Sequence, residues 1–206
     1  MIKLRWRLSL QIRGNGPVKL LATDYFAPNK KNASATLRAY ADYDRGGDFS
    51  DKKISSDLIG EGFFSLIIDQ GANMEPYKGI TPIVQGDLAR SAETYFFQSE
   101  QIFTLFSLDI KKNEKSDKKS SWSAAGLMVQ ELPNGKEKKQ KLAKKIWEDY
   151  SNKIIENVRI YSNKKKTDEY QFLNDVFDTM GITVYPPKKI KFGCSCKEDK
   201  LLATLK

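Results

Sequence analysis

The 206-residue sequence contains no histidine and only two cysteines. Histidine is the side chain that most often serves as a general base near neutral pH, so its absence removes any Ser-His or Cys-His nucleophile pair. The two cysteines, Cys194 and Cys196, are too few for the disulfide framework of a small secreted protein. These absences exclude most hydrolases, and we expect a protein that is not an enzyme.

Long apolar runs are also missing. No stretch reaches the roughly eighteen apolar residues of a membrane-spanning helix, and the first ten residues alternate basic and apolar side chains. A signal peptide has a continuous apolar region in that place. The sequence therefore predicts a protein without a membrane partner that stays in the cytoplasm.

The sequence is rich in positive charge, with a formal net charge of +9. Much of the excess lies in two lysine-rich stretches, residues 111–119 and 136–145. Such runs usually form solvated surfaces, and no glycine-aromatic RNA-binding signature accompanies them. We expect no specific nucleic-acid partner, although a basic RNA- or ribosome-associated binding protein stays open as an alternative.

Apolar periodicity predicts a sheet-rich first part. Residues 3–13 alternate almost perfectly between apolar and polar, as in a half-buried strand, and Gly14-Asn15-Gly16-Pro17 predicts a turn. After Gly86 the apolar spacing changes to three and four residues, which predicts a helix. Further strands are expected near residues 18–26, 36–44, 62–69, 77–84, 102–110 and 122–132. The predicted fold class is α+β, with a mixed, mainly antiparallel sheet covered by helices.

The pattern becomes helical after residue 132. Helices are expected at residues 140–158 and 168–179, and an extended segment then leads to the cysteines. We therefore predict a sheet-rich core domain at 1–132, a helical linker at 133–180 and a separate C-terminal segment at 181–206.

Cys194 and Cys196 are separated by one residue, which is close enough to bind one soft metal ion or to oxidise to each other. Spacing alone leaves a simpler alternative, two small half-buried side chains at the end of a strand. A thiol oxidoreductase is a third alternative, but no thioredoxin-like βαβ pattern surrounds the pair.

Several motifs resemble, in the same order, the redox-regulated holdase family often called the 33 kDa chaperonin or heat shock protein 33 homolog. The most specific of them, Tyr95–Gln101 (YFFQSEQ), ends the predicted helix. The others are Gln11–Pro17 (QIRGNGP), Leu37–Ala41 (LRAYA), Gly60–Phe64 (GEGFF), Tyr77–Ile80 (YKGI), Ala124–Gln130 (AAGLMVQ) and Phe192–Cys196 (FGCSC).

The resemblance implies an ATP-independent chaperone that binds unfolding or oxidised client proteins, usually as a homodimer. Reduced cysteines would hold Zn²⁺, and oxidation would form a disulfide, release the metal and unfold the switch and linker. Cys194 and Cys196 match the first pair of zinc ligands and would form the redox-active disulfide.

Family members have a helical segment before the first strand and a second cysteine pair after the first. We therefore expect this chain to be truncated at both ends, with an incomplete redox-switch segment at 181–206. The alternative function is a degenerate fragment with constitutive chaperone activity or none.

Overall fold

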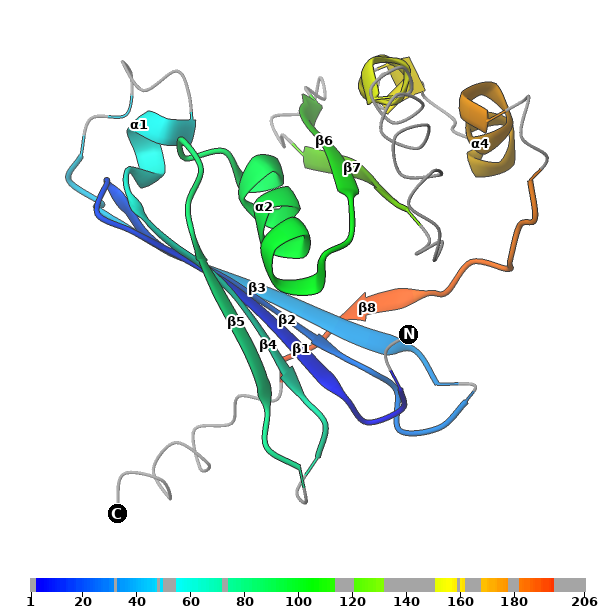
Figure 1. Cartoon of the computed structure of the whole chain (residues 1–206), viewed down its shortest axis with the longest axis horizontal. Helices are drawn as coiled ribbons and strands as arrows, with labels where there is room; N and C mark the ends of the chain where they lie inside the picture. The colour runs from blue at the N-terminus through cyan, green and yellow to red at the C-terminus, as the bar shows by residue number, and fades with distance from the viewer. Residues whose placement is uncertain are drawn as a thin grey trace. The chain divides into compact units, whose positions relative to one another are not determined.

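The computed structural model describes residues 3–31, 33–47, 49, 55–71, 74–113, 121–131, 151–158, 160–161, 168–177 and 182–194. The chain forms two compact units, residues 1–91 with 187–206 and residues 92–186. Each unit has its own β-sheet, and the helices are few (Figure 1). This mixed, mainly antiparallel architecture confirms the predicted fold class. No helix within the described ranges is long and apolar enough to cross a membrane.

The first unit is built on a six-stranded sheet with the strand order β5-β4-β1-β2-β3-β8 (Figure 1). Its neighbouring strands run antiparallel, except for β3 and β8, which run parallel. The strands are β1 (Arg7–Gly14), β2 (Val18–Phe26), β3 (Ala35–Tyr43), β4 (Gly62–Asp69), β5 (Tyr77–Pro82) and β8 (Ile190–Phe192).

The sequence predictions for this sheet are close, with two corrections. The strands expected at residues 18–26 and 62–69 are confirmed at those bounds. The first strand begins at Arg7 and not at residue 3, because Arg5 has a positive φ of 65° and the Trp6 N–H turns back to the Lys3 carbonyl at 3.3 Å. The short helix α1 (Ser55–Ile59) lies where only a polar connection was expected.

The predicted turn at Gly14-Asn15-Gly16 is confirmed, and it packs against the chain that leads from α1 into β4. The Asn15 N–H donates to the Glu61 carbonyl at 2.9 Å, and the Glu61 N–H donates to Asn15 Oδ1 at 2.9 Å. A Cβ atom on Gly62 would lie 1.8 Å from the Arg13 carbonyl oxygen. Two segments far apart in the sequence therefore meet where only glycine fits.

Helix α2 (Leu88–Glu100) begins after Asp87, whose carboxylate accepts the Arg90 N–H at 3.1 Å. This is the arrangement of an N-cap residue, which satisfies a free N–H group of the first turn. Near the other end of the helix, the Tyr95 hydroxyl donates to Glu100 Oε1 at 3.2 Å. The helix predicted after Gly86 is therefore confirmed.

The second unit contains a two-stranded ribbon of β6 (Thr104–Asn113) and β7 (Ser121–Gln130), helical residues 151–158 and 160–161, and α4 (Glu169–Phe177). Leu105, Ile154 and Val176 form its buried core, and the partly buried residues Leu127, Val129, Phe172 and Phe177 pack against them. The helices predicted at residues 140–158 and 168–179 are confirmed where they are described, and residues 140–150 and 178–179 lie outside the described residues.

A hydrogen bond from the Tyr161 hydroxyl to Asp175 joins the helical residues 160–161 to α4. Tyr161 is only 5% exposed, and its ring lies edge-on against Phe172 with 4.7 Å between the ring centroids. The hydrogen bond to the carboxylate, together with burial, raises the pKa of Tyr161 from 10.0 to about 12. This contact therefore requires a protonated tyrosine.

Gly62→Ala tests the close approach at the start of β4. The added Cβ overlaps the Arg13 carbonyl, so the backbone of β1 or β4 must shift, and we expect the free energy of unfolding to fall by about 2 kcal/mol or more. Urea unfolding measures this change. Gly46→Ala is the matched control, because its Cβ would meet only Asp44 Oδ1 at 3.7 Å. Equal stability of the two variants contradicts the argument.

Tyr161→Phe tests the helix contact through its pH dependence. The folded-state pKa is raised, so the contribution of Tyr161 is complete below pH 10 and is lost as the pH rises toward about 12. The variant should be less stable than the wild type at neutral pH, and the difference should close over that window. Urea unfolding at a series of pH values measures it, and a difference that stays constant with pH contradicts the role of the hydrogen bond.

Candidate functional site

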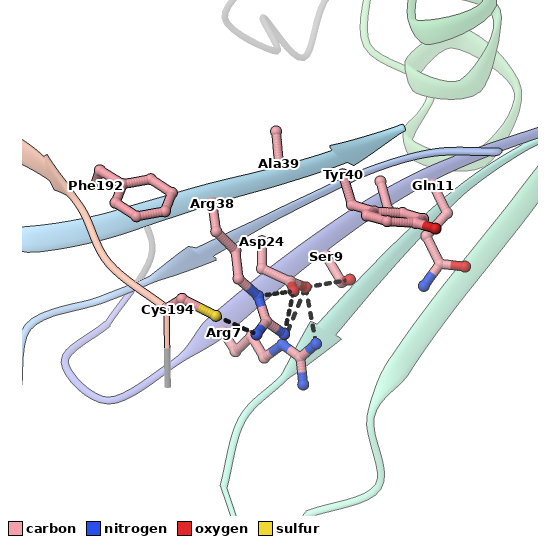
Figure 2. A pocket seen from close by; sticks show the side chains of 10 residues that line it. Arg7, Ser9, Gln11, Asp24, Arg38, Ala39, Tyr40, Phe192 and Cys194 are labelled. Carbon is pink, nitrogen blue, oxygen red and sulfur yellow. Dashed lines mark hydrogen bonds and ion pairs between the residues drawn. The ribbon is translucent and has the colours of Figure 1, made fainter. Parts of the chain in front are cut away.

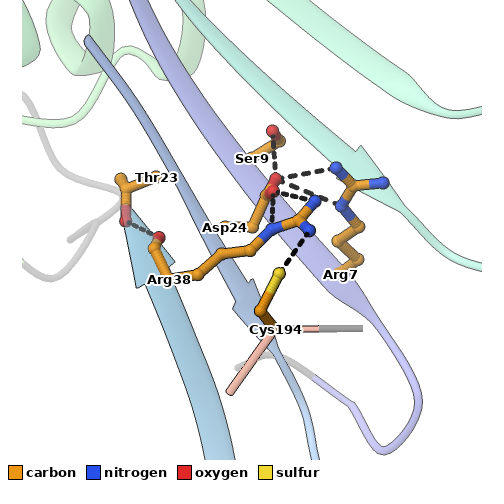
Figure 3. Close-up of polar contacts among 6 residues, drawn as sticks. All are labelled: Arg7, Ser9, Thr23, Asp24, Arg38 and Cys194. Atoms are coloured by element: carbon orange, nitrogen blue, oxygen red, sulfur yellow. Dashed lines mark hydrogen bonds and ion pairs between the residues drawn. The ribbon is translucent and has the colours of Figure 1, made fainter. Parts of the chain in front are cut away.

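A cluster of charged and polar side chains lies on one face of the first unit's sheet. Ser9 of β1 is opposite Asp24 of β2, and Asp24 is opposite Arg38 of β3, so the register places all three on the same face. Arg7 is two residues before Ser9 on β1 and therefore points to that face as well. Figure 3 shows the side chains of Ser9, Arg7 and Arg38 converging on the Asp24 carboxylate.

Asp24 is the acceptor for the whole cluster. Its Oδ1 accepts from Ser9 Oγ at 2.6 Å and from Arg7 Nη2 at 2.8 Å, and its Oδ2 accepts from Arg38 Nε at 2.7 Å. The carboxylate is buried, with 8% of Asp24 exposed. Burial alone raises the pKa of Asp24, but the Ser9 hydroxyl and the two guanidinium groups outweigh it and hold the pKa below 3.8. Asp24 is therefore ionised at neutral pH.

The two arginines are also fixed by an aromatic ring. The guanidinium carbons of Arg7 and Arg38 lie 5.3 and 5.4 Å from the centroid of the Phe26 ring. Phe26 is two residues after Asp24 on β2, so the ring and the carboxylate face the same side of the sheet. Each arginine is thus held by an ion pair and by a cation–π contact.

Cys194 reaches this cluster because β8 adds to the edge of the sheet beside β3. Ile190, Lys191 and Phe192 pair with Ala35, Thr36 and Leu37, and the Gly193 N–H then donates to the Leu37 carbonyl at 3.1 Å. Cys194 is exposed, and Arg38 Nη1 donates to its Sγ at 3.7 Å (Figure 3). Cys196, the other predicted site residue, lies outside the described residues.

A hollow of about 450 Å³ opens between Cys194 and the polar cluster. Figure 2 shows the Cys194 thiol and the Phe192 ring on one side of it, with Arg38, Asp24 and Arg7 toward the sheet and Tyr40 and Gln11 farther along. Ser9, Ala22 and Ala39 complete its lining. The thiol therefore faces an open, charged hollow that small molecules can reach.

Of the two predicted zinc ligands, Cys194 is the one that the structure describes. Zinc in a structural site takes four cysteine or histidine ligands. Among the residues that the structure describes, no group of three or more histidine, cysteine, aspartate or glutamate side chains could hold a metal ion. The side chain that donates to Cys194 Sγ is that of Arg38, and a guanidinium group is not a zinc ligand. Zinc binding by Cys194 and Cys196 stays a prediction.

Sequence reasoning missed the partners of Cys194. Arg38 was noted only as part of a family motif, and Asp24 was not singled out at all. A signal was present: Asp24 is the one carboxylate in the mostly apolar strand Val18–Phe26, and a buried charge in such a position requires a partner. The pairing of β8 with β3 could not be predicted from the sequence, because local periodicity does not encode contacts between residues so far apart.

Asp24→Asn tests whether the carboxylate holds three strands together. The variant leaves two guanidinium groups without their counter-charge, and we expect about 2 kcal/mol less stability at neutral pH, measured by urea unfolding. The pKa of Asp24 is lowered on folding, so its contribution is present above pH 3.8 and is lost as the pH falls further. Asp42→Asn, at an exposed carboxylate on β3, is the control. Equal losses in both variants contradict this role.

Comparison with known proteins gives one consistent family. The family model described as Hsp33 protein matches residues 1–206. A protein named 33 kDa chaperonin from Caulobacter vibrioides is 27% identical over 215 residues, covering 97% of this chain and 65% of its own length. A protein of the same name from Neisseria meningitidis serogroup B is 26% identical over 200 residues, covering 97% of this chain and 59% of its own.

The fold agrees with a solved structure. The crystal structure of the 33 kDa chaperonin (heat shock protein 33 homolog) from Thermotoga maritima matches with a TM-score of 0.69 at 21% identity, over 99% of this chain and 65% of that one. The chain thus spans less than two thirds of the length of each of these relatives. Because the family model matches along the whole sequence, this chain belongs to the Hsp33 protein family.

Proposed function

We propose that this protein is an ATP-independent chaperone, and not an enzyme, that binds unfolding proteins and prevents their aggregation under oxidising conditions. Membership of the Hsp33 family supports the chaperone activity. The observation that carries the redox control is the position of Cys194, an exposed thiol two residues after the end of a three-residue strand at the edge of the sheet. Oxidation of this thiol would act on β8, a short strand whose side chains are all exposed.

The redox step joins Cys194 and Cys196. Each thiol loses one proton and one electron, the two sulfur atoms form a disulfide, and one molecule of hydrogen peroxide is reduced to two molecules of water. The hollow beside Cys194 gives a small oxidant access to its sulfur. A disulfide between residues so close in sequence bends the chain after β8, which disturbs the contact of Cys194 with Arg38.

Zinc is part of this proposal as the metal of the reduced state. Cys194 and Cys196 would supply two thiolate ligands, and the rest of the shell would come from other groups. When bound, the metal would cross-link these ligands and so stabilise the C-terminal segment. The segment at 181–206, the linker at 133–180 and the core at 1–132 are then the switch, the connection and the body of the chaperone.

Exposed apolar side chains provide surface for clients in both units. On the β6–β7 ribbon, one face packs on the core and the other carries four large side chains that are more than half exposed, Leu108, Ile110, Trp122 and Met128. Apolar patches of this kind bind exposed apolar segments of other proteins. We propose unfolded or oxidised proteins as partners, a homodimer as the assembly and the cytoplasm as the location.

A light-scattering assay tests this function. A heat-aggregating client is warmed with the reduced protein or with protein treated with peroxide, and we expect suppression of aggregation to increase several-fold after peroxide. Cys194→Ser cannot form the disulfide, so its suppression should not respond to peroxide. Ser195→Ala is the matched control, because it changes the residue between the cysteines and keeps both thiols.

The outcomes separate the two parts of the proposal. Equal suppression with and without peroxide removes the redox control and leaves a chaperone. The absence of suppression in both states removes the chaperone activity from this chain.

A further inference from the structure

Among the residues that the structure describes, β8 is the strand that pairs with the outer side of β3, and it covers only part of that side. β3 has nine residues, whereas β8 has three and pairs with β3 only as far as Leu37. β3 continues for six residues beyond this point, to Tyr43. We refer to the outer side of β3 from Leu37 to Tyr43 as the β3 edge (Figure 1).

The contacts that hold β8 are mostly those of the backbone. All three of its side chains are exposed, with Ile190 at 53% and Phe192 at 82%. Burial of apolar area therefore adds little to its binding. Beyond the ladder, the described residues add the Gly193 hydrogen bond to Leu37 and the contact of Cys194 with Arg38. A strand held in this way can be displaced by another extended chain.

The β3 edge has the groups that strand addition requires. The Leu37 carbonyl faces β8, and backbone groups of alternate residues in a strand point to the same edge, so those of Ala39 and Ala41 face outward too. Large apolar side chains along the strand are exposed, with Tyr40 at 62% and Tyr43 at 49%. An added strand would form hydrogen bonds with the outward backbone groups and would make cross-strand contacts with the tyrosine side chains.

The usual protection of an edge strand is weak here. Edge strands commonly carry lysine or proline, which oppose pairing with other chains. β3 contains neither; its charged residues are Asp42, which is exposed, and Arg38, which is paired with Asp24 on the neighbouring strand. The edge is thus suited to accept a further strand.

We propose that the β3 edge is a strand-addition site for an extended segment of an unfolded polypeptide, and that β8 competes for the near end of the same edge. This rests on the proposed chaperone function and names where and how the client binds. Recognition through the backbone reads no particular side chains, which suits a protein that must bind many sequences. Release of β8 removes Cys194 from Arg38 and frees Leu37, so the same movement connects the thiol with the client site.

The test measures binding of a short fluorescent peptide of alternating valine and threonine by fluorescence anisotropy. Ala41→Pro removes an outward N–H donor and places a ring on the edge, and we expect about tenfold weaker binding. Ala41→Ser keeps the N–H and a small side chain, and it should bind the peptide as the wild type does.

Gly193→Val tests the competition with β8. A Cβ on Gly193 would lie 2.8 Å from Thr36 Cγ2, so a larger side chain lifts this end of β8 from β3. We expect the peptide to bind this variant several-fold more tightly. An analogue of the peptide with N-methylated backbone nitrogens should bind the wild type at least about tenfold more weakly, and this arm keeps the test decisive where the proline variant does not fold.

The results separate this proposal from the proposed function. Unchanged peptide affinity in Ala41→Pro and Gly193→Val overturns the edge site, and suppression of client aggregation by the same samples shows that the chaperone function stands without it. Concentration-dependent dimerisation that Ala41→Pro abolishes, with no peptide binding by the wild type, assigns the edge to a second copy and also overturns the proposal.

Discussion

The first unit depends on one buried carboxylate. Asp24 is in the centre of three adjacent strands, and it accepts hydrogen bonds from Ser9 and Arg7 on one neighbour and from Arg38 on the other. A charge with so little exposure would be costly without these donors. The same geometry fixes the Arg38 side chain in the position from which it reaches Cys194. The ion-pair cluster thus connects the register of the sheet with the predicted redox residue.

Local patterns in the sequence predicted most of the first sheet. Alternation of apolar residues predicted the strands, and glycine with asparagine predicted the turn at residues 14–16, because these signals act within a few residues. The start of β1 was predicted too early, since the left-handed backbone of Arg5 breaks an alternating pattern without changing it. The helix predicted after Gly86 is present for the same local reason as the strands.

The candidate site was only partly predictable. Cys194 was identified from its spacing to Cys196 and from the family resemblance, both of which are visible in the sequence. Its environment depends on β8 joining β3, which pairs Phe192 with Leu37 across most of the chain. No periodicity encodes such a contact, so the Arg38 neighbour, the hollow and the pairing of β8 with the first three residues of β3 became visible only in the folded structure. Family membership, in turn, comes from the match along the chain and not from this geometry.

The late position of β8 in the chain has a consequence during synthesis. The five antiparallel strands are complete once residue 82 has been made, whereas β8 begins only at residue 190. At bacterial and eukaryotic translation speeds, the intervening stretch takes about 5 to 20 s to synthesise. During that interval the nascent sheet has its outer strand without this cover, next to whatever other chains emerge nearby. The nascent chain thus presents an edge that the finished fold covers at Ala35–Leu37.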